Sequence, residues 1–511
     1  MKKKWFRVLF RRRVAVTFLL LLQIAVIVVL LLYRSKNSWI FNGLMTTVSV
    51  IVAVKIIANR TKGAYKLTWV FQILLFPIFG GLFYVLFKFQ MSRMKYNKRI
   101  NHYKYITEPL YLLTGNLYKA KDVIQKKYLP QVNYLQNFAG FPIYNHTKTQ
   151  YLPSGEAKFK AMLVELKKAE KYIFLEYFII ESGLMWDSIL EILKEKAAQG
   201  IDVRLIYDDV GCLFLLPKDY PEQLEAFGIK CIAFNRFNPI LSATQNNRDH
   251  RKILVIDGKV AFTGGVNLAD EYINHIEKYG HWKDAAIQLD GHGAWSFTLI
   301  FLEMWYLASN VEEDYEAFYP WKDHPCNIET DGLVQPYSDS PLDDENVGEH
   351  VYLQIINNAK EYVYINTPYL VIDDSMVSAL CLAAKSGIDV RIITPDKYDK
   401  WIVHVTTRSY YRELIKAGVK IYEYTNGFNH GKTFVSDNSI ATVGTTNLDF
   451  RSLYLHFECG VVLFDNSAIH DIYNDFMKTL DKSRLIKEDD YKGNVLSRLA
   501  QDFLRVFAPL M

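Results

Sequence analysis

The chain has 511 residues, more than one ordinary domain needs, and its length suits two domains with additional segments. Half of the residues are hydrophobic, so a large core can form, while the mild net charge of +5 argues against a dedicated nucleic-acid-binding protein. The five cysteines include no CxxC pair, which indicates free thiols and excludes a disulfide framework.

The first 90 residues are predicted to be a membrane anchor. Residues 14–33 contain no charge, and a helix of that length would be about 30 Å long, the thickness of a hydrocarbon core. Two further apolar runs, 39–57 and 67–87, are candidates for additional membrane segments, which leaves two or three crossings open. We therefore expect a multi-pass protein of the cell membrane.

Basic residues flank this anchor on both sides. Residues 1–13 carry seven cations and no acid, and a basic, aromatic stretch follows residue 87. Because such clusters favour the cytoplasmic side, we expect the region after the anchor to face the cytoplasm. Residues 91–150 are predicted to be a juxtamembrane linker at an anionic headgroup surface.

The remainder of the chain repeats itself. Residues 167–180 resemble 357–371, residues 197–209 resemble 383–396, and residues 227–234 resemble 417–424. Each unit alternates an apolar, β-branched run with a helical pattern, which is typical of α/β domains. A boundary near residue 330 divides the predicted halves, 151–330 and 331–495.

The C-terminal stretch, 496–511, has apolar residues at helical spacing and charged residues opposite. It predicts an amphipathic helix. The helix could pack on the catalytic region, or it could lie on a membrane surface.

One motif occurs in each half, as HRKILVID (250–257) and HGKTFVSD (430–437). The copies agree at five positions that are all 180 residues apart. The pairs are His250 and His430, Lys252 and Lys432, Asp257 and Asp437, Gly264 and Gly444, and Asn267 and Asn447.

The motif predicts a strand, a tight turn at the aspartate and a second strand. Residues i and i+2 of a strand share a face, so the histidine and lysine of each copy should point the same way. If the halves pack about a pseudo-twofold axis, two histidines, two lysines and two asparagines meet in one pocket. Asp257 and Asp437 could take part there or could only cap the turns.

Such a pocket suits a phosphodiester. The ammonium groups of Lys252 and Lys432 can stabilise the non-bridging oxygens, and the amides of Asn267 and Asn447 can add donors. One imidazole can attack phosphorus while the other transfers protons.

The duplicated pattern H-x-K-x4-D-x6-G-[GT]-x-N resembles the HKD signature of the phospholipase D superfamily. With the hydrophobic segments over 39–87, the chain resembles the bacterial cardiolipin synthases in particular, over roughly residues 40–511. The resemblance implies two duplicated phospholipase D-like α/β/α sandwich halves and a phosphatidyl transfer between two phosphatidylglycerol molecules. It implies anionic membrane lipids as partners and no nucleic acid, metal or other cofactor.

The resemblance also implies roles for single residues. His250 would be the nucleophile and His430 the acid and base, and the acid downstream of each motif, Asp284 or Glu458, would orient the histidine of that motif. Alternative functions are hydrolysis of phospholipids, phosphatidyl transfer to another alcohol, a nuclease on the same fold, and a membrane scaffold without catalysis.

Overall fold

The computed structural model describes residues 39–59, 62–75, 80–81, 84–85, 91–113, 123–237, 243–322, 325–329, 331–343, 345–491 and 495–510. The predicted membrane segment 14–33 lies outside the described residues, and the segment 67–87 is described only in part. Two helices near the N-terminus, α3 (Trp39–Ala58) and α4 (Gly63–Leu75), pack on each other through a small cluster of apolar side chains. Among the described helices, none is both long enough and apolar enough to cross a membrane.

The predicted linker 91–150 contains α6 (Met91–Tyr111), which packs on α12 (His292–Ser309). Tyr103 is fully buried there, and its hydroxyl donates a hydrogen bond to the carbonyl of Leu299 at 2.7 Å. This part of the basic stretch therefore belongs to the folded body of the protein, a contact that its composition alone did not predict.

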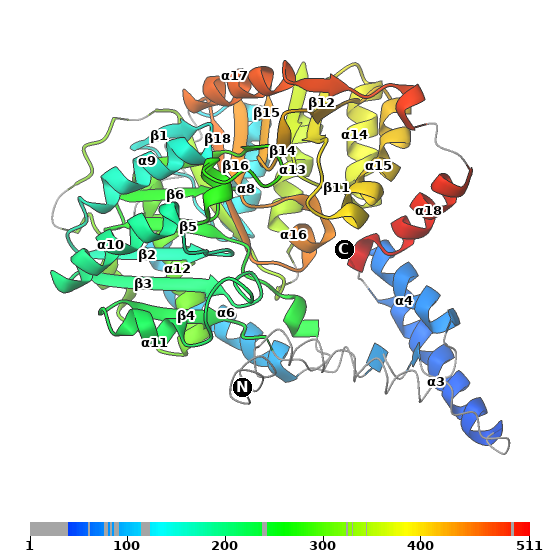
Figure 1. Ribbon diagram of the computed structural model, residues 1–511, viewed down its shortest axis with the longest axis horizontal. Helices are drawn as coiled ribbons and strands as arrows, with labels where there is room; N and C mark the ends of the chain where they lie inside the picture. Colours follow the sequence, from blue (N-terminus) through cyan, green and yellow to red (C-terminus); the bar gives the residue numbers. More distant parts are fainter. Residues whose placement is uncertain are drawn as a thin grey trace, which may run out of the picture. The chain divides into compact units, whose positions relative to one another are not determined.

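The first half is built on a seven-stranded sheet (Figure 1). The central strand β2 is parallel to β3, which is parallel to β4, whereas the strands on the other side of β2 are antiparallel to their neighbours. In spatial order the strands are β1 (Thr147–Leu152), β8 (Ala286–Gly291), β6 (Val260–Gly264), β5 (Lys252–Ile256), β2 (Tyr172–Tyr177), β3 (Asp202–Asp208) and β4 (Lys230–Phe234).

The second half repeats this topology and adds one edge strand. Its central strand β10 is again parallel to two successive strands on one side and antiparallel to a hairpin on the other. The order is β9 (Leu333–Asp339), β18 (Glu458–Phe464), β16 (Ile440–Gly444), β15 (Thr433–Ser436), β10 (Tyr362–Asn366), β12 (Asp389–Pro395), β13 (Lys420–Tyr424) and β19 (Ser483–Leu485). The predicted α/β fold with two duplicated halves is thus confirmed at the level of strand order.

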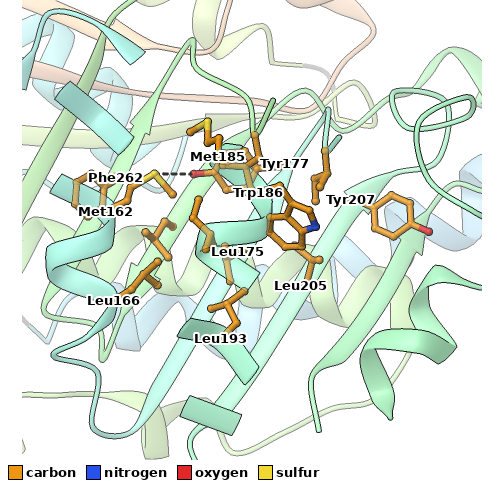
Figure 2. Packing of buried hydrophobic residues seen from close by; sticks show 14 of the residues in the cluster. Met162, Leu166, Leu175, Tyr177, Met185, Trp186, Leu193, Leu205, Tyr207 and Phe262 are labelled. Atoms are coloured by element: carbon orange, nitrogen blue, oxygen red, sulfur yellow. Dashed lines mark hydrogen bonds between the residues drawn. The ribbon is translucent and has the colours of Figure 1, made fainter. Parts of the chain in front are cut away.

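Helices cover both faces of the first sheet because its central strand alternates. Leu175 points among side chains of the helices on one face, such as Met162 and Trp186 (Figure 2). The adjacent Phe174 points to the other face and stacks on Phe301 of α12, with ring centroids 4.6 Å apart. Successive strand residues point to opposite faces, so this alternation produces an α/β/α sandwich.

An equivalent aromatic contact occurs in the second half. Tyr364 of β10 stacks on Phe476 of α17 (Ala468–Leu480), with ring centroids 4.8 Å apart. The other long helices of the halves are α9 (Gly155–Leu166), α10 (Leu184–Ala198), α13 (Val347–Asn358), α14 (Asp374–Lys385) and α15 (Trp401–Lys416). Shorter elements are α8 (Leu129–Asn137), α11 (Tyr220–Glu225), α16 (Phe450–Tyr454), β7 (His281–Lys283), β11 (Leu370–Val371), β14 (Gly427–Asn429), β17 (Leu448–Asp449) and the 3-10 turns η1 (Lys126–Tyr128), η2 (Ala243–Asn246), η3 (Asp270–Ile273), η4 (Tyr315–Phe318) and η5 (Glu488–Tyr491).

The predicted C-terminal helix is α18 (Val495–Val506), followed by the turn η6 (Ala508–Leu510). It lies beside α15, and the guanidinium of Arg505 pairs with the carboxylate of Glu413 at 2.9 Å (Figure 1). The helix is therefore held on the catalytic region by at least one polar contact.

Replacing Tyr103 with alanine is expected to lower the free energy of unfolding by about 3–5 kcal/mol, because a fully buried aromatic ring is removed from the α6–α12 contact. The matched change Tyr105→Ala removes a ring that is 78% exposed on the same helix, and should cost less than about 0.5 kcal/mol. Denaturant titration of the detergent-solubilised protein measures both effects. Equal effects would contradict the packing of α6.

Candidate active site

Each copy of the motif lies on a β-hairpin. Lys252 is the first residue of β5, and Lys432 immediately precedes β15. Asp257 and Gly258 are the central residues of the turn in the first hairpin, with φ angles of 52° and 66°, and Asp437 opens the second turn with a φ of 50°. Two central residues with positive φ make a turn that matches the twist of antiparallel strands, which explains the Asp-Gly and Asp-Asn pairs.

The two histidines lie in the loops before these strands, and each is bonded to a carboxylate of the opposite half. Nδ1 of His250 is 2.8 Å from Oε1 of Glu458, and Nδ1 of His430 is 2.6 Å from Oδ2 of Asp284. All four side chains are buried. Both predicted acids therefore contact an imidazole, but the expectation that each acid serves the histidine of its own motif is wrong.

Backbone hydrogen bonds between the halves produce this crossed pairing. The N–H of His250 donates to the carbonyl of Phe457 at 3.0 Å, next to Glu458. In the other half, β14 pairs in parallel with β7, and the N–H of His430 donates to the carbonyl of Lys283 at 2.6 Å, next to Asp284. Each histidine is thus aligned by the strand that carries the other half's acid.

The ammonium groups of the two motif lysines are buried, and the surrounding protein compensates little of their charge. Nζ of Lys252 donates to the carbonyl of His250 at 2.5 Å, and Nζ of Lys432 donates to that of His430 at 2.5 Å. Burial lowers the pKa of Lys252 to about 8 and that of Lys432 to about 7. Because the protein stabilises these charges poorly, an anion in the pocket would gain two strong partners.

The imidazoles are neutral in this setting. Burial, and then the charge of Lys252, lowers the pKa of His250 well below its usual value. Burial, and then Lys432, lowers the pKa of His430 to about 4. A neutral imidazole that donates its Nδ1–H to a carboxylate keeps a lone pair on Nε2, which is the form needed by a nucleophile or a base.

The two acids differ in their ionisation. Burial pushes the pKa of Asp284 upward, but His430 and Lys432 outweigh it and hold the pKa below the usual value. Burial dominates at Glu458 and raises its pKa well above the usual value, although Lys252 opposes the shift. The negative charge of the resting site therefore resides mainly on the acid that faces His430.

The two asparagines predicted to bind phosphate lie buried in the loops after β6 and β16. Oδ1 of Asn267 accepts the N–H of Ile179 at 3.1 Å, and its Nδ2 donates to the hydroxyl of Tyr272 at 2.7 Å, which leaves one amide hydrogen for a ligand. Oδ1 of Asn447 is buried and has no hydrogen-bond partner among the described residues.

Of the two alternatives for Asp257 and Asp437, the structure favours capping of the turns over a role in the pocket. Asp257 accepts the backbone N–H groups of residues 170, 171 and 172 at 2.8, 2.7 and 2.8 Å. Asp437 accepts those of residues 360, 361 and 362 at 2.9, 2.9 and 3.2 Å. Both carboxylates stand at the far end of their strand, about 16 Å from the motif lysine, so they tie the hairpin to the sheet.

Glycine ends the second strand of each hairpin. A Cβ at Gly264, where φ is 142°, would lie 2.4 Å from the carbonyl oxygen of the residue after Asp284. A Cβ at Gly444 would lie 2.6 Å from the carbonyl oxygen of the residue after Glu458. The missing side chain lets each hairpin approach the strand that carries an acid.

The residue after each of these two glycines matches the length of the acid that it faces. A Cβ at Gly265 would lie 2.0 Å from Oδ1 of Asp284, so the short carboxylate occupies this space. The equivalent Thr445 instead donates its hydroxyl hydrogen to Oε2 of the longer Glu458 at 2.5 Å. The two halves thus support different acids at equivalent positions.

Sequence reasoning missed His456. Its ring centroid is 5.5 Å from that of His250, and its Nδ1 is 3.9 Å from Oε1 of Glu458. Both ring nitrogens are buried and have no hydrogen-bond partner among the described residues. Its place two residues before Glu458 was the available signal, since residues at i and i+2 of an extended segment share a side.

Sequence reasoning also missed Arg251, which is fully buried between the halves. Its Nη2 donates to Oγ of Ser338 at 2.7 Å, and its Nη1 lies 3.5 Å from Oε1 of Glu176. Its Nε donates to the carbonyl of Glu458 at 3.3 Å. The guanidinium therefore connects strands of both sheets directly behind the site.

Three side chains could hold a metal ion. His250, His456 and Glu458 each offer a ligand atom, and these atoms lie within 4.8 Å of one another. The set contains ligand types that zinc accepts. However, two buried ammonium groups act on the same pocket, and their charge favours an anion over a divalent cation. The arrangement therefore suits a phosphate group best.

Comparisons with known proteins agree with this chemistry. A family model described as cardiolipin synthase, PLD-like domain, matches residues 162–279 and 352–480, and one described as phospholipase D-nuclease N-terminal matches residues 46–88. An uncharacterized protein of Streptococcus mutans is 46% identical over 448 residues, 87% of this chain and 96% of the relative. A cardiolipin synthase of Geobacillus kaustophilus is 34% identical over 490 residues, 94% of this chain and 95% of the relative.

Among solved structures, a phosphatidylserine synthase of Haemophilus influenzae matches with a TM-score of 0.55. The match covers 76% of this chain and 98% of the other, at 14% sequence identity. At this identity the similarity concerns the fold of the two halves, and it agrees with the strand order described above.

The affinity of the pocket for dimethyl phosphate, whose charge is constant near neutral pH, is expected to fall by about tenfold or more between pH 6.5 and pH 9. Lysine is charged below its pKa, and the pKa is about 7 for Lys432 and about 8 for Lys252, so both charges are lost across this range. Calorimetric titration measures the affinity. Lys432→Arg keeps its charge to pH 9 and should flatten the profile, whereas a flat profile in the unmodified protein would contradict the assignment.

Proposed function

The chain belongs to the phospholipase D-like family of cardiolipin synthases, and we propose that it transfers a phosphatidyl group from one phosphatidylglycerol to another, giving cardiolipin and glycerol. The observation that carries the proposal is the pair of crossed histidine–carboxylate bonds. Each bond provides an imidazole with a free Nε2 beside buried ammonium groups, which is the equipment for a double displacement at phosphorus.

In the first step, Nε2 of His250 attacks the phosphorus of one phosphatidylglycerol. An N–P bond forms and the P–O bond to the headgroup glycerol breaks, while His430, which takes up a proton when the anionic phosphate enters the pocket, gives that proton to the departing glycerol oxygen. Glu458 accepts the Nδ1–H of His250 and stabilises the positive charge that the ring acquires. The products of this step are glycerol and a phosphatidyl-histidine.

In the second step, His430 removes a proton from the headgroup hydroxyl of a second phosphatidylglycerol. That oxygen attacks phosphorus, the N–P bond breaks, and cardiolipin leaves with the electron pair returned to His250. Asp284 stabilises the protonated form of His430, which begins the first step and is regenerated by the second. The cycle is balanced and uses no nucleotide, metal or other cofactor.

The different environments of the histidines support these roles. Burial lowers the pKa of both histidines, but at His430 the charge of Asp284 and the hydrogen bond to it oppose this shift, so His430 is the ring favoured to take up a proton. It also faces Asp284, whose low pKa keeps a negative charge beside it. A general acid must be protonated when the reaction begins and a nucleophile must not, so His430 suits the first role and His250 the second.

Lys252 and Lys432 are proposed to bind the non-bridging phosphate oxygens and to stabilise their charge in the transition state. The remaining amide hydrogen of Asn267 and the side chain of Asn447 are proposed to complete this anion site. His456 offers two unused ring nitrogens beside His250, and we assign it to a hydroxyl of the glycerol headgroup.

We also propose that the N-terminal segments hold the enzyme in the cell membrane as a multi-pass protein. The charge-free run 14–33, the runs 39–57 and 67–87, and the N-terminal family match over residues 46–88 support this. Cations on both sides of the anchor favour a catalytic region on the cytoplasmic side. Phosphatidylglycerol and other anionic lipids would then be its partners, with no role for nucleic acid.

The purified protein in micelles that contain phosphatidylglycerol is expected to form cardiolipin and glycerol in equal amounts without added nucleotide or metal. Lipid chromatography and an enzymatic glycerol assay measure the products. Dependence on CDP-diacylglycerol would overturn the mechanism. Phosphatidic acid as the main product would instead establish hydrolysis, and a new phospholipid formed only with another alcohol would establish a different acceptor.

The crossed pairing predicts which acid works with which histidine. On phosphatidylglycerol, Asp284→Ala and His430→Ala should each slow adduct formation by about a hundredfold or more, because proton transfer to glycerol is lost. With phosphatidyl-p-nitrophenol, whose leaving group needs no proton, both variants should still release a rapid burst of p-nitrophenolate. His250→Ala should give no burst with either substrate, and Glu458→Ala should be slow with both.

Asp290→Ala, in the same strand region as Asp284 but outside the pocket, is the matched control and should keep transfer within about twofold of the unmodified protein. If Asp284→Ala lost the burst together with His250→Ala, each acid would serve its own motif in catalysis, and the crossed assignment would be rejected.

A further inference from the structure

Helix α18 turns its apolar side away from the protein. Arg505 faces the catalytic region, where it pairs with Glu413 at 2.9 Å and its guanidinium carbon lies 4.3 Å from the ring centre of Tyr410. Leu499 and Phe503, in contrast, are 60% and 56% exposed. A surface helix normally buries its apolar stripe and exposes its polar one, so α18 has the opposite orientation.

The geometry of the helix confirms that these are different faces. At 100° per residue, Leu499 and Phe503 lie about 40° apart, and their mean direction is about 140° from that of Arg505. Leu510, in the turn that follows, is also 40% exposed. The apolar residues therefore form one outward stripe on the helix and its terminal turn.

This stripe ends beside α16, the short helix that precedes His456 of the candidate site. The turn η6 contacts α16, and Nη2 of Arg451 in α16 donates to the carbonyl of Leu510 at 3.0 Å. The backbone N–H of His456 donates to the carbonyl of Arg451 at 2.9 Å, so α16 connects this turn to the site.

A second exposed apolar group lies at the start of α15, the helix on which α18 packs. Tyr398, Trp401 and Ile402 are 49%, 59% and 48% exposed, and the exposed Lys397 and Lys400 alternate with them. Asp396 and Asp399 in the same segment are partly buried, and Asp399 accepts the hydroxyl of Tyr369 at 2.5 Å. Tryptophan, tyrosine and lysine in close succession are the residue types that favour the headgroup region of an anionic membrane.

We propose that these two groups form a docking face for an anionic lipid bilayer at the mouth of the active site. The docking face consists of Tyr398, Trp401, Ile402, Leu499, Phe503 and Leu510. This inference rests on the proposed function in one respect, since a lipid-metabolising site gains from such a face. The docking face allows the headgroups of two lipids to enter the pocket while their acyl chains stay in the membrane.

Charge favours a bilayer over a second copy of the chain as the occupant. A twofold dimer through this face would bury Lys397, Lys400 and Arg451 of both copies in one interface, which concentrates like charge there. Anionic headgroups neutralise all three cations, while the apolar side chains enter the boundary with the acyl chains. The docking face thus combines electrostatic attraction to headgroups with burial of apolar side chains, the two attractions that hold an interfacial helix on a membrane.

Site-specific quenching tests the proposal on the full chain. Cys326 and Cys381, the two free thiols that are not fully buried, are replaced with alanine, and a single cysteine is introduced by Phe503→Cys. The protein is labelled with a bimane dye and reconstituted in vesicles that contain phosphatidylglycerol. Phe227→Cys provides the matched control, because Phe227 is a phenylalanine of similar exposure, 49%, on the first half.

The dye at position 503 is expected to be quenched at least about threefold more by doxyl-labelled lipid than by aqueous iodide, and the dye at position 227 should show the reverse. Equal iodide access at the two positions would overturn the proposal. Shielding of position 503 that depends on protein concentration in detergent without lipid would also overturn it, in favour of a protein partner. These readouts need no catalysis, so they are distinguishable from a failure of the proposed reaction.

A functional comparison adds a second measurement. Leu499→Ser combined with Phe503→Ser should lower transfer in vesicles by about fivefold, yet leave transfer between short-chain lipids dissolved in detergent within about twofold. Phe227→Ser should change neither rate. An equal loss in both assays would mean that the stripe supports the folded site, and would count against docking.

Discussion

The site depends on one constraint: each histidine is held by a carboxylate from the other half. Residues 250 and 458 are 208 positions apart in the chain, and residues 430 and 284 are 146 apart. Both bonds form only when the two sheets are in register across their common boundary, where backbone hydrogen bonds and the buried Arg251 connect the halves. Neither half therefore contains a complete acid–imidazole pair, and duplication alone would not create the site without this docking.

The same boundary concentrates positive charge that the folded protein stabilises poorly. Two lysines and two imidazoles share a buried pocket, and burial lowers the pKa of all four. Removing such groups from water costs several kcal/mol per charge unless an opposite charge compensates. A phosphodiester supplies that charge, so the pocket has low stability when empty and high complementarity when occupied, which is the usual compromise of sites built for transition-state charge.

Local patterns predicted the fold well because the responsible forces are local. The two-residue turns at Asp257 and Asp437 and the alternating strands follow from backbone sterics and from the period of two, and the repeat placed both hairpins. The same local information could not separate a capping aspartate from a catalytic one, since the three amides that Asp257 binds lie more than 80 residues away. Nor could it determine which acid meets which histidine. His456 was not predicted, because the equivalent residue two positions before Asp284 is Trp282, so comparison of the two repeats did not indicate a histidine at this place.

The differences between the halves matter as much as their likeness. A fully symmetric site would offer two equivalent imidazoles, and either could attack phosphorus while the other moved the proton. Here the equivalent positions carry different side chains: Asp284 and Glu458, Gly265 and Thr445, Trp282 and His456, and Arg251 and Gly431. The shorter acid keeps a low pKa and faces His430, whereas the longer one is bound by a threonine hydroxyl and has a raised pKa. A double displacement needs one ring that attacks unprotonated and one that gives up a proton in the first step and regains one in the second, so these substitutions convert a duplicated scaffold into a site with two distinct roles.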